Sequence, residues 1–444
     1  MQQEDSKGVS RRSLLKRATA GASSFLIIKP ELVRGAGKEK LRAGLVGCGG
    51  RGTQAIIDLL TGTENVEVVA MGDLFEDRLE QSLRRIRDAQ KFPKIQDRIK
   101  VDPEHRFVGF DAYKKVLASD IDIVMLCTPP GYRPEHFEAA IEARKHVFCE
   151  KPFGTDPVGV RRFMAAARKS EELKLTVVSG AQRRFARDYQ ETIEKIQNGA
   201  IGEVLATYAY WVGSPVLQFL SPNWPGPKGQ RDPRWGDMTW QNRNWYSFVW
   251  LCGDQVVEQH IHNIDVCNWV MGTHPVKVVA SGGVAWRPRE EPYGNIYDHL
   301  SADFEYPNGV RMSSYCRQYP QGCAQNVSEL VVGTKGRSNC HDLGSGTRQD
   351  VRRQFQDPLE NPYVREHVAM VNSIRGDGPY VNHAMAVAES TMTCIMAREA
   401  AYSGLEITWD MIMNSKLDLY PKAFDYDAKV EVPPLPVPGQ YKFI

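Results

Sequence analysis

The chain has 444 residues, of which 42% are hydrophobic and 25% charged, a length that suits two or three domains with a substantial core. Its formal net charge at pH 7 is +2, and residues 38–444 alone carry a net charge of −2. A nearly neutral chain lacks the basic surface of a nucleic-acid-binding protein, so no nucleic-acid partner is expected. The nine cysteines form no C-x-x-C pair, which argues against a zinc ribbon and a disulfide framework.

Residues 1–37 have the pattern of an export leader. Ser10–Lys16 reads SRRSLLK, and small and apolar residues follow it from Ala18 to Ile28. A twin arginine before a moderate apolar run is typical of a twin-arginine signal, and the run is shorter than the ~20 residues of a membrane span. A basic amphipathic helix on the mature protein is the alternative. We therefore expect twin-arginine export to the periplasm or the medium, and no stable membrane span.

A glycine-rich turn follows the first predicted strand. Leu41–Val46 suits a buried parallel strand, GCGGRG at residues 47–52 comes next, and Thr53–Leu60 has helical spacing. In a dinucleotide-binding turn the first glycine permits a tight bend, the second lets the backbone approach a pyrophosphate, and the third lets helix and strand pack closely. The helix N-terminus adds unpaired N–H groups. The predicted cofactor-binding residues here are Gly47, Gly49, Gly50, Arg51 and Gly52.

An acidic residue ends the second predicted strand. The run Val66–Met71 leads into Gly72 and Asp73, and Asp73 lies 21 residues after Gly52. At this distance an acidic residue is expected to bind the hydroxyls of the adenosine ribose. A carboxylate would repel a 2′-phosphate, so NAD is favoured over NADP. The alternative is an exposed aspartate that caps a helix.

Strands and helices continue to alternate as far as residue 178. Apolar runs cover residues 121–127, 146–149 and 175–178, and helical spacing covers residues 135–144. This alternation predicts a parallel, doubly wound α/β sheet whose ligand lies beyond the carboxyl ends of the strands. The residues at those ends are Gly47, Asp73, Thr128 and Lys151.

Four segments occur in an order that points to one family: GLVGCGGRG, CTPPGYRPEH, CEKPFG and EQHIHNIDVCNWVMG. With GAQRRF, NGAIGEV and VVGTKG they resemble the glucose–fructose oxidoreductase, inositol dehydrogenase and rhizopine-catabolism (Gfo/Idh/MocA) family of NAD(P)-dependent enzymes. The resemblance implies an NAD-binding Rossmann domain at residues 38–175. It also implies an α/β substrate and oligomerisation domain at residues 176–444, with a large open, mostly antiparallel sheet. The active site would lie between them, and the protein would be a homo-oligomer, a dimer or tetramer.

The resemblance also assigns residues to the cofactor and to the chemistry. The ammonium of Lys151 would contact the nicotinamide ribose and the substrate hydroxyl, and Pro152 would hold the backbone of Lys151 extended. The segments CTPPGYRPEH and CEKPFG supply further candidate cofactor-binding residues, namely Thr128, Pro129, His136, Glu150 and Lys151.

A second catalytic segment is predicted on one helix. At 100° per residue, Glu258, His262 and Asp265 fall on one face. In the family pattern His262 is the general base, and Asp265 binds the substrate or orients His262. This chain departs from the pattern because Glu258 replaces the usual Asp and His260 replaces a usual glycine.

Two other interpretations of these histidines stay open. His262 can be a core histidine, or His260, His262 and His274 can form a metal site with Glu258. The spacing is not H-E-x-x-H, and hydride transfer needs no metal, so we predict no metal site.

The predicted substrate residues lie mainly in a long loop. Six of the nine tryptophans fall between Trp211 and Trp250, in a stretch interrupted by Pro and Gly. Indoles can stack on sugar faces, and the alternative is that they fill the core or a subunit contact. The candidates are Arg183, Trp211, Asn244 and Trp245, together with Tyr208.

The sequence therefore predicts an exported NAD-dependent oxidoreductase that acts on a secondary alcohol of a sugar, polyol or related carbohydrate. His262 would accept the hydroxyl proton, and Lys151 would stabilise the developing alkoxide. The alternative is an NAD-dependent glycosidase that works by transient oxidation and elimination with no net redox. A third possibility is a carbohydrate-binding or cofactor-sensing protein without turnover.

Overall fold

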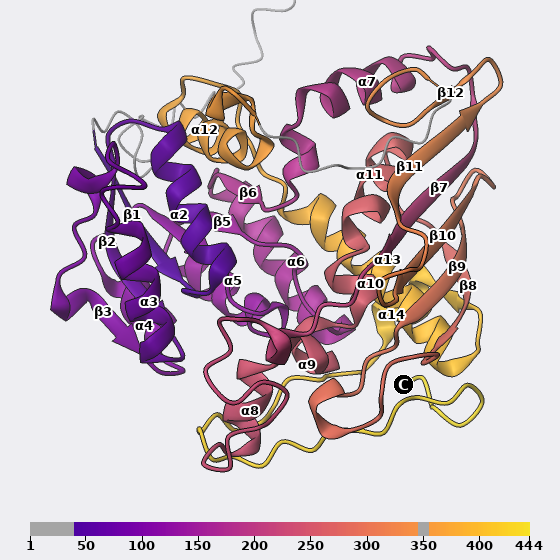
Figure 1. Ribbon diagram of the computed structural model, residues 1–444. Helices are drawn as coiled ribbons and strands as arrows, with labels where there is room; N and C mark the ends of the chain where they lie inside the picture. Colours follow the sequence, from indigo (N-terminus) through magenta and orange to yellow (C-terminus); the bar gives the residue numbers. More distant parts are fainter. Residues whose placement is uncertain (1–39, 345–354) are drawn as a thin grey trace, which may run out of the picture.

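The computed structural model describes residues 40–344 and 355–444, so the predicted leader lies outside the described residues. Two sheets with helices between them make up the fold (Figure 1). The first sheet has the strand order β3-β2-β1-β4-β5-β6, and every pair in it is parallel. Its strands are β1 Leu41–Val46, β2 Val66–Asp73, β3 Arg106–Val108, β4 Ile123–Leu126, β5 His146–Cys149 and β6 Val177–Ser179.

The central strands β4 and β5 are buried along their whole length, and β1 is buried except at Arg42, as expected for a parallel sheet with helices on both faces. The order of the strands confirms the predicted Rossmann fold. Because β6 pairs with β5, this sheet continues past residue 175, where the domain boundary was placed from the sequence. The helices that follow its strands are α2 Gly50–Gly62, α3 Glu76–Ile86, α4 Ala112–Ala118, α5 Arg133–Glu142 and α6 Pro157–Glu172.

A helix from the far end of the chain completes the core of the Rossmann domain. Helix α12, Pro362–Arg375, lies beside α2 (Figure 1). Its residues Met370, Val371 and Ile374 are buried in the same hydrophobic cluster as Ile56 of α2. The chain therefore returns to the first domain after it has built the second.

The second sheet has seven strands in the order β12-β11-β7-β10-β9-β8-β13. Only the β7–β10 pair is parallel, which confirms the prediction of a mostly antiparallel sheet. Strand β9 alternates between half-buried and buried residues, the pattern of a sheet packed on one face. The strands are β7 Val204–Gly213, β8 Lys277–Gly283, β9 His299–Glu305, β10 Arg311–Gln318, β11 Asn326–Gly333, β12 Arg337–Ser338 and β13 Ile407–Thr408.

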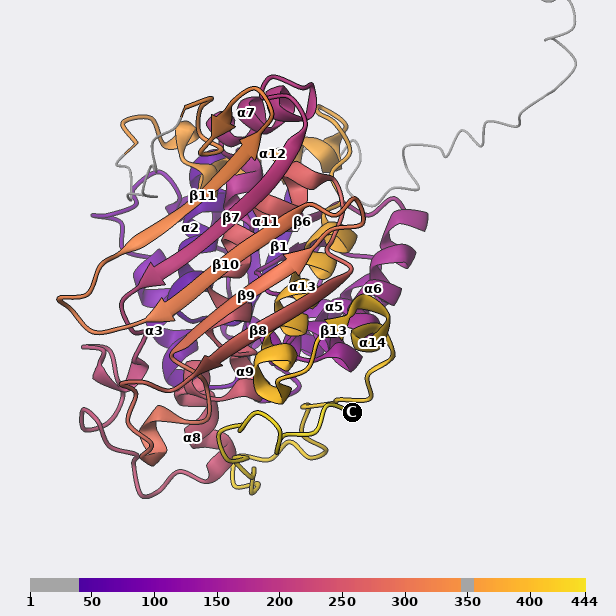
Figure 2. The ribbon, with the colours of Figure 1, turned by 90° about the vertical axis from the view of Figure 1, so that its right-hand side faces the viewer.

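Helices cover one face of the second sheet and, among the described residues, leave the other face open to the viewer in Figure 2. Helix α13, Ala384–Ser403, is buried nearly all round because it packs on β8, α6 and α11. The other helices are α7 Arg187–Gln197, α8 Asp237–Arg243, α9 Val249–Cys252, α10 Gln255–Glu258, α11 Ile261–Met271 and α14 Trp409–Asn414. Among the described residues we find no helix with the length and apolar character of a membrane span.

Candidate active site

The glycine-rich turn connects β1 to α2. Gly47 has φ +95°, and a side-chain carbon there would lie 2.6 Å from the backbone of Cys127 and Thr128. A side-chain carbon on Gly52 would lie 1.9 Å from the carbonyl oxygen of Gly47. These two glycines are therefore required by the bend and by close packing. Around Gly49 and Gly50, in contrast, no atom lies within 4 Å of such a carbon, so both have open space where a phosphate would approach.

A cavity of about 580 Å³ opens in front of this turn and extends to the second domain. Its size is in the range of ~300–1,000 Å³ that small-molecule sites occupy. The glycine turn, the carboxyl ends of the strands in the first sheet, and the second domain all contribute residues to the wall of this cavity. The predicted site residues that line it are Gly47, Gly49, Gly50, Arg51, Asp73, Thr128, Pro129, His136, Glu150, Lys151, Trp245, Glu258 and His262.

Asp73 lies at the end of β2, beside the glycine turn. Its carboxylate accepts hydrogen bonds from the backbone N–H of Cys48 at 2.6 Å and of Phe75 at 2.9 Å. These bonds hold the carboxylate in the wall of the cavity. Because each carboxylate oxygen can accept more than one hydrogen bond, Asp73 keeps acceptor capacity for two ribose hydroxyls.

Arg51 is tied to carboxylates rather than free to bind a phosphate. Its guanidinium contacts Glu150 at 2.5 Å, Glu366 at 2.9 Å and Asp58 at 3.2 Å. The ring of Tyr363 lies against the guanidinium, 4.8 Å from its carbon. Arg51 therefore connects α2, the segment just after β5, and α12, which orders the turn that would bind the pyrophosphate.

Thr128 and His136 line the cavity next to the end of β4. The hydroxyl of Thr128 lies 3.3 Å from Nδ1 of His136, and the His136 ring stacks on Tyr113 at 4.1 Å. Burial lowers the pKa of His136 to about 3, aided by the nearby cations of Arg133 and Arg162. His136 is therefore a neutral, rigidly packed wall of the cavity.

Lys151, Glu258 and His262 form what we term the cavity cluster. The Lys151 ammonium donates to the Glu258 backbone oxygen at 2.6 Å and to Oε1 of its carboxylate at 3.0 Å. The second carboxylate oxygen of Glu258, Oε2, is buried and has no hydrogen-bond partner among the described residues. The His262 ring stacks on Trp211 of β7, with a centroid distance of 5.7 Å. The cluster thus brings an ammonium, a carboxylate oxygen and an imidazole to one cavity.

The charge state of His262 follows from its surroundings. Burial holds its pKa well below the usual value, and the cations of Lys151, Arg183 and Arg51 lower it further. A histidine with a lowered pKa is neutral at neutral pH. A neutral imidazole has a lone pair that can accept a proton, as a general base requires.

The prediction of one continuous helix from Glu258 to Asp265 is wrong. Helix α10 ends at Glu258 and α11 begins at Ile261. At the break the backbone N–H of His260 bonds to the oxygen of Gln255, five residues earlier, which departs from the i to i−4 pattern. The His260 ring is buried here, 2.7 Å from the hydroxyl of Ser314 on β10.

Asp265 does not line the cavity. Its carboxylate accepts two hydrogen bonds from the Arg184 guanidinium, both at 2.8 Å, and one from the Ser390 hydroxyl at 2.7 Å. We term these three residues the lock, because they join α11 to α13 and to the turn after β6. Asp265 is thus held by protein groups, one turn along α11 from His262.

Two family models match the chain. One, described as an oxidoreductase family with an NAD-binding Rossmann fold, matches residues 41–178, and the GFO/IDH/MocA C-terminal domain matches residues 189–338. The chain belongs to the Gfo/Idh/MocA family. This confirms the predicted family, the oxidoreductase class and NAD as the cofactor.

Among similar members of the Gfo/Idh/MocA family are two curated inositol dehydrogenases. Myo-inositol 2-dehydrogenase of Thermotoga maritima is 24% identical, over 67% of this chain and 74% of that protein. The NAD⁺-dependent scyllo-inositol 2-dehydrogenase of Bacillus subtilis is 22% identical, over 78% of this chain and 89% of that protein. The fold resembles scyllo-inositol dehydrogenase from Lactobacillus casei with bound NAD(H) and scyllo-inositol, with a TM-score of 0.61, 19% identity, and coverage of 83% of this chain and 99% of that one.

The predicted substrate residues of this family member separate into two groups. Trp245 lines the cavity, and Trp211 borders it through its stacking on His262. Arg183 instead forms a buried ion pair with Glu329 at 2.5 Å. The buried amide of Asn244 donates to the backbone oxygen of Pro292 at 2.7 Å. Tyr208 lies on β7, where its ring stacks on Tyr210, and it does not line the cavity.

The tryptophan-rich loop has both a packing role and a place in the cavity wall. Trp235, Trp240 and Trp250 pack together with the C-terminal tail, and Trp224 joins that cluster while also lining the cavity. Several residues that line the cavity were not predicted, because four of them are polar residues of the tryptophan-rich loop that carry no motif and two come from other segments. The residues not predicted are Gln182, Gln218, Asn223, Asn242, Arg243 and Tyr363.

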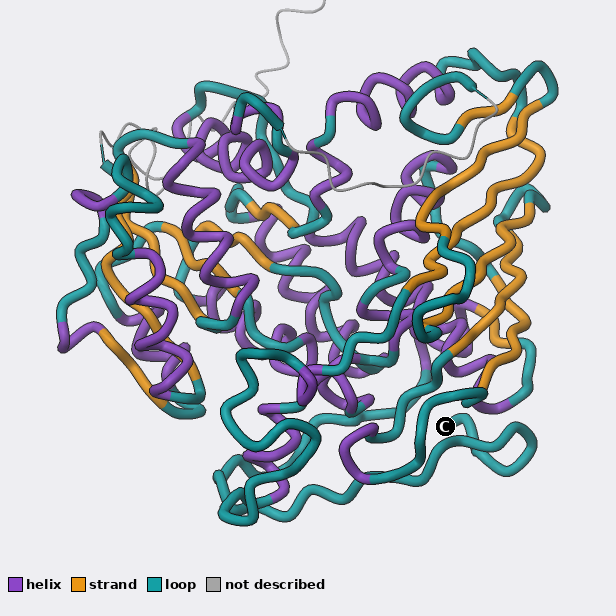
Figure 3. The backbone as a smooth tube through the Cα atoms, viewed as in Figure 1, coloured by secondary structure: helices purple, strands orange, loops and turns teal. Residues whose placement is uncertain are grey.

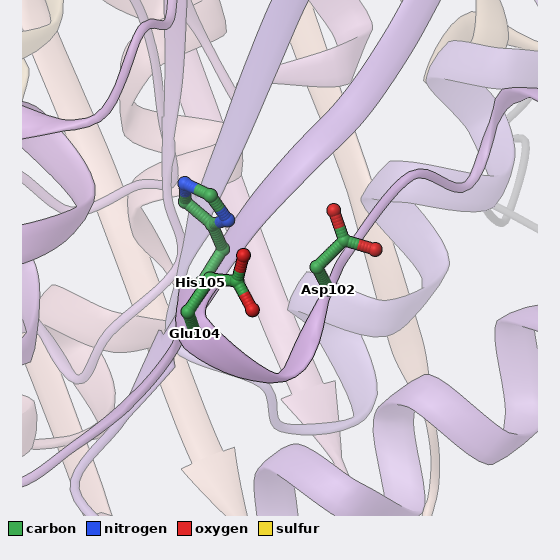
Figure 4. A group of neighbouring side chains, drawn as sticks. All are labelled: Asp102, Glu104 and His105. Atoms are coloured by element: carbon green, nitrogen blue, oxygen red, sulfur yellow. The ribbon is translucent and has the colours of Figure 1, made fainter.

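The described residues contain one group of three side chains with metal-ligand atoms within 4.8 Å of one another, namely Asp102, Glu104 and His105 (Figure 4). Both carboxylates are exposed, and none of the three lines the cavity. Of the histidines considered for a metal site, His274 stacks on Trp409 at 3.6 Å, away from the cavity cluster.

Proposed function

We propose that the chain oxidises or forms a secondary alcohol in a neutral sugar or polyol, with NAD as the hydride acceptor or donor. The observation that carries the proposal is that the ammonium of Lys151 and the neutral imidazole of His262 line one cavity with the glycine turn. Both inositol dehydrogenases named above are consistent with such a substrate.

The residues at the nucleotide end fit NAD. Gly49 and Gly50 leave room for the pyrophosphate, and Asp73 has acceptor capacity for the adenosine ribose. When bound, the nicotinamide supplies hydride transfer. The chain contributes the orientation of that group toward the cavity cluster.

The cavity cluster handles the proton and the charge on oxygen. His262 accepts the hydroxyl proton at a ring nitrogen, because its lowered pKa leaves the ring neutral. Lys151 stabilises the negative charge that develops on the alcohol oxygen. Glu258 holds the Lys151 ammonium in place through Oε1.

Glu258 and Trp245 favour a neutral polyhydroxylated substrate. The unpartnered Oε2 of Glu258 can accept a hydrogen bond from a second hydroxyl next to the reacting one. A carboxylate on the substrate would be repelled by the same oxygen. The indole of Trp245 offers apolar surface to the C–H face of a ring, and Trp211 supports the His262 ring from behind.

The test is a panel of inositols, neutral sugars, uronates and aryl glycosides, incubated with purified protein and NAD⁺. We expect NADH to accumulate with a neutral polyol or sugar, and little with the corresponding uronate. Release of an aglycone without net NADH would contradict the proposal and support the glycosidase. Binding of a sugar without either product would contradict both.

We also propose that the chain forms a homo-oligomer through the open face of its second sheet. On that face Tyr210 stacks on Tyr315 at 5.6 Å, and Tyr315 is 45% exposed. Aromatic surface of this kind on a sheet is commonly covered by a partner. Light scattering of the wild type and of Tyr315→Asp tests the proposal, and a wild-type monomer would contradict it.

Export through residues 1–37 also remains a proposal, supported by the SRRSLLK sequence. We expect the periplasmic fraction of a twin-arginine-competent host to contain the protein, and Arg11→Lys with Arg12→Lys to retain it in the cytoplasm. Equal distribution of both proteins would contradict export by this route.

A further inference from the structure

Two segments that are far apart in the sequence form one unit at the edge of the cavity. Helix α8 bonds along the C-terminal tail: the Thr239 hydroxyl donates to the Tyr426 backbone oxygen at 2.9 Å, and the Gln241 amide donates to the Val430 oxygen at 2.7 Å. Figure 3 shows both segments, largely loop, at the bottom of the molecule. We term residues 218–245 and 420–430 the clamp.

The clamp contacts the NAD-binding domain at the loop after β2, at the first turn of α3 and at the loop after β3. Arg243 forms a double ion pair with Asp77, at 2.8 and 3.0 Å, and its guanidinium lies 3.9 Å from the ring centre of Phe75. From the tail, the Tyr426 hydroxyl donates to the Leu74 oxygen at 2.6 Å, and its ring packs on Phe110 at 5.2 Å.

These contacts lie over the end of the cavity where the adenosine half of NAD would bind. Asp73, the predicted ribose ligand, is two residues before Phe75 and accepts a hydrogen bond from its backbone N–H. Phe75, Phe110 and Arg243 line the same cavity as Asp73. The two domains therefore meet across the adenosine end as well as across the nicotinamide end.

Two hydrogen-bond donors of the clamp are left without a partner. Nε of Arg243 and Nε1 of Trp224 are buried and have no hydrogen-bond partner within the described part of the chain. Both residues line the cavity. A buried donor without an acceptor lowers stability, and a molecule bound in the cavity can supply the acceptors for these N–H groups.

We propose that the clamp closes over the adenosine half of bound NAD, with Arg243 and Trp224 donating to its acceptor atoms, and that release of the nucleotide is therefore slow. This inference rests on the proposed NAD site. The contacts of Arg243 with Asp77 and Phe75 must break before the nucleotide can leave. Release is then limited by opening of the clamp.

The experiment measures the release of NADH from the purified protein, by the loss of its fluorescence when excess NAD⁺ is added. We expect Arg243→Ala to release NADH about tenfold faster than the wild type, which corresponds to about 1.4 kcal/mol for the lost cation–π contact and ion pair. Trp224→Phe keeps an aromatic ring but removes the N–H, and we expect a smaller acceleration. Mass spectrometry of the denatured wild type should find copurified nucleotide, with less in Arg243→Ala.

Arg234→Ala is the matched control. Arg234 belongs to the same loop, but its side chain is 85% exposed and pairs with Asp232, so its removal should leave the release rate unchanged. If Arg243→Ala fails to fold, Asp77→Asn removes the same ion pair from the other domain. A wild type that binds no NADH would overturn the clamp and the proposed function together. A wild type that binds NADH, with equal release from a folded Arg243→Ala or Asp77→Asn, would overturn the clamp alone.

Discussion

The cavity cluster and the lock lie one helical turn apart, yet their carboxylates differ in how far they are hydrogen-bonded. In the lock, both carboxylate oxygens of Asp265 accept hydrogen bonds from Arg184 or Ser390. In the cavity cluster, Oε2 of Glu258 is buried beside the Lys151 ammonium and has no partner in residues 40–344 or 355–444. A fully paired carboxylate stabilises the fold, whereas an unpaired acceptor next to a cavity is available to a ligand. Under the proposed function, the residues at one end of this turn take part in the chemistry and those at the other end stabilise the fold.

Among changes that test this contrast, we expect His262→Ala to have the largest effect, which is on turnover. Loss of the proton acceptor should lower kcat by about 10²- to 10⁴-fold, because general-base catalysis contributes that much. Titration with NADH should give an unchanged affinity, and the melting temperature should stay near that of the wild type. Turnover equal to the wild type would remove His262 from the mechanism.

Asp265→Ala should have the converse effect. It leaves the nearly buried guanidinium of Arg184 without its carboxylate, and removal of one partner of a buried ion pair costs about 3–5 kcal/mol in the free energy of unfolding. Urea denaturation measures this loss, with Ser390→Ala as a milder control. At temperatures where the variant is folded, kcat and KM should change little. A stable variant with little turnover would instead show that Asp265 acts in catalysis.

Glu258→Gln tests whether one side chain both holds Lys151 in place and contacts the substrate. The amide can still accept a hydrogen bond from Lys151, but the charge-assisted part of that bond is lost. We expect kcat/KM to fall about 10- to 100-fold, the equivalent of ~1.5–3 kcal/mol for a hydrogen bond to a charged group. The same variant should accept uronates better than the wild type does, and an unchanged preference for neutral substrates would argue against the substrate role of Oε2.

The smallest expected effect is on the pH dependence of kcat/KM. Because burial and nearby cations hold the pKa of His262 below its usual 6.5, the ring stays neutral as the pH falls through 6.5. We expect kcat/KM to remain level there and to decline only at lower pH, where His262 becomes protonated. A pH profile with excess NAD⁺ measures this. A break at 6.5 would mean that the reacting base is exposed and unperturbed, unlike His262.

Local sequence patterns were sufficient to select residues that line the cavity beside the glycine turn. The roles of Gly47 and Gly52 follow from a turn only six residues long, and Asp73 and Lys151 follow from the rule that ligands gather at the carboxyl ends of parallel strands. The two-sheet architecture followed from the family resemblance carried by the motifs.

Contacts that depend on distant segments could not be predicted. Helical spacing placed Asp265 beside His262, but the break before Ile261 and the reach of Arg184 from another element direct it elsewhere. Arg183 and Asn244 were candidates because of their residue type, and their partners, Glu329 and Pro292, come from remote parts of the chain. Tertiary pairing, which a single sequence does not reveal, decided these positions.

Helix α12 has a consequence for how this protein can be dissected. It supplies Met370, Val371 and Ile374 to the core beneath β1 and β2, and Glu366 to the arginine of the glycine turn. A fragment cut off after β6 would expose that apolar surface to water and leave Arg51 short of one carboxylate. The nucleotide half is therefore not a portable module: any truncated or split version has to carry residues 362–375 with it, as a separate peptide or a grafted extension.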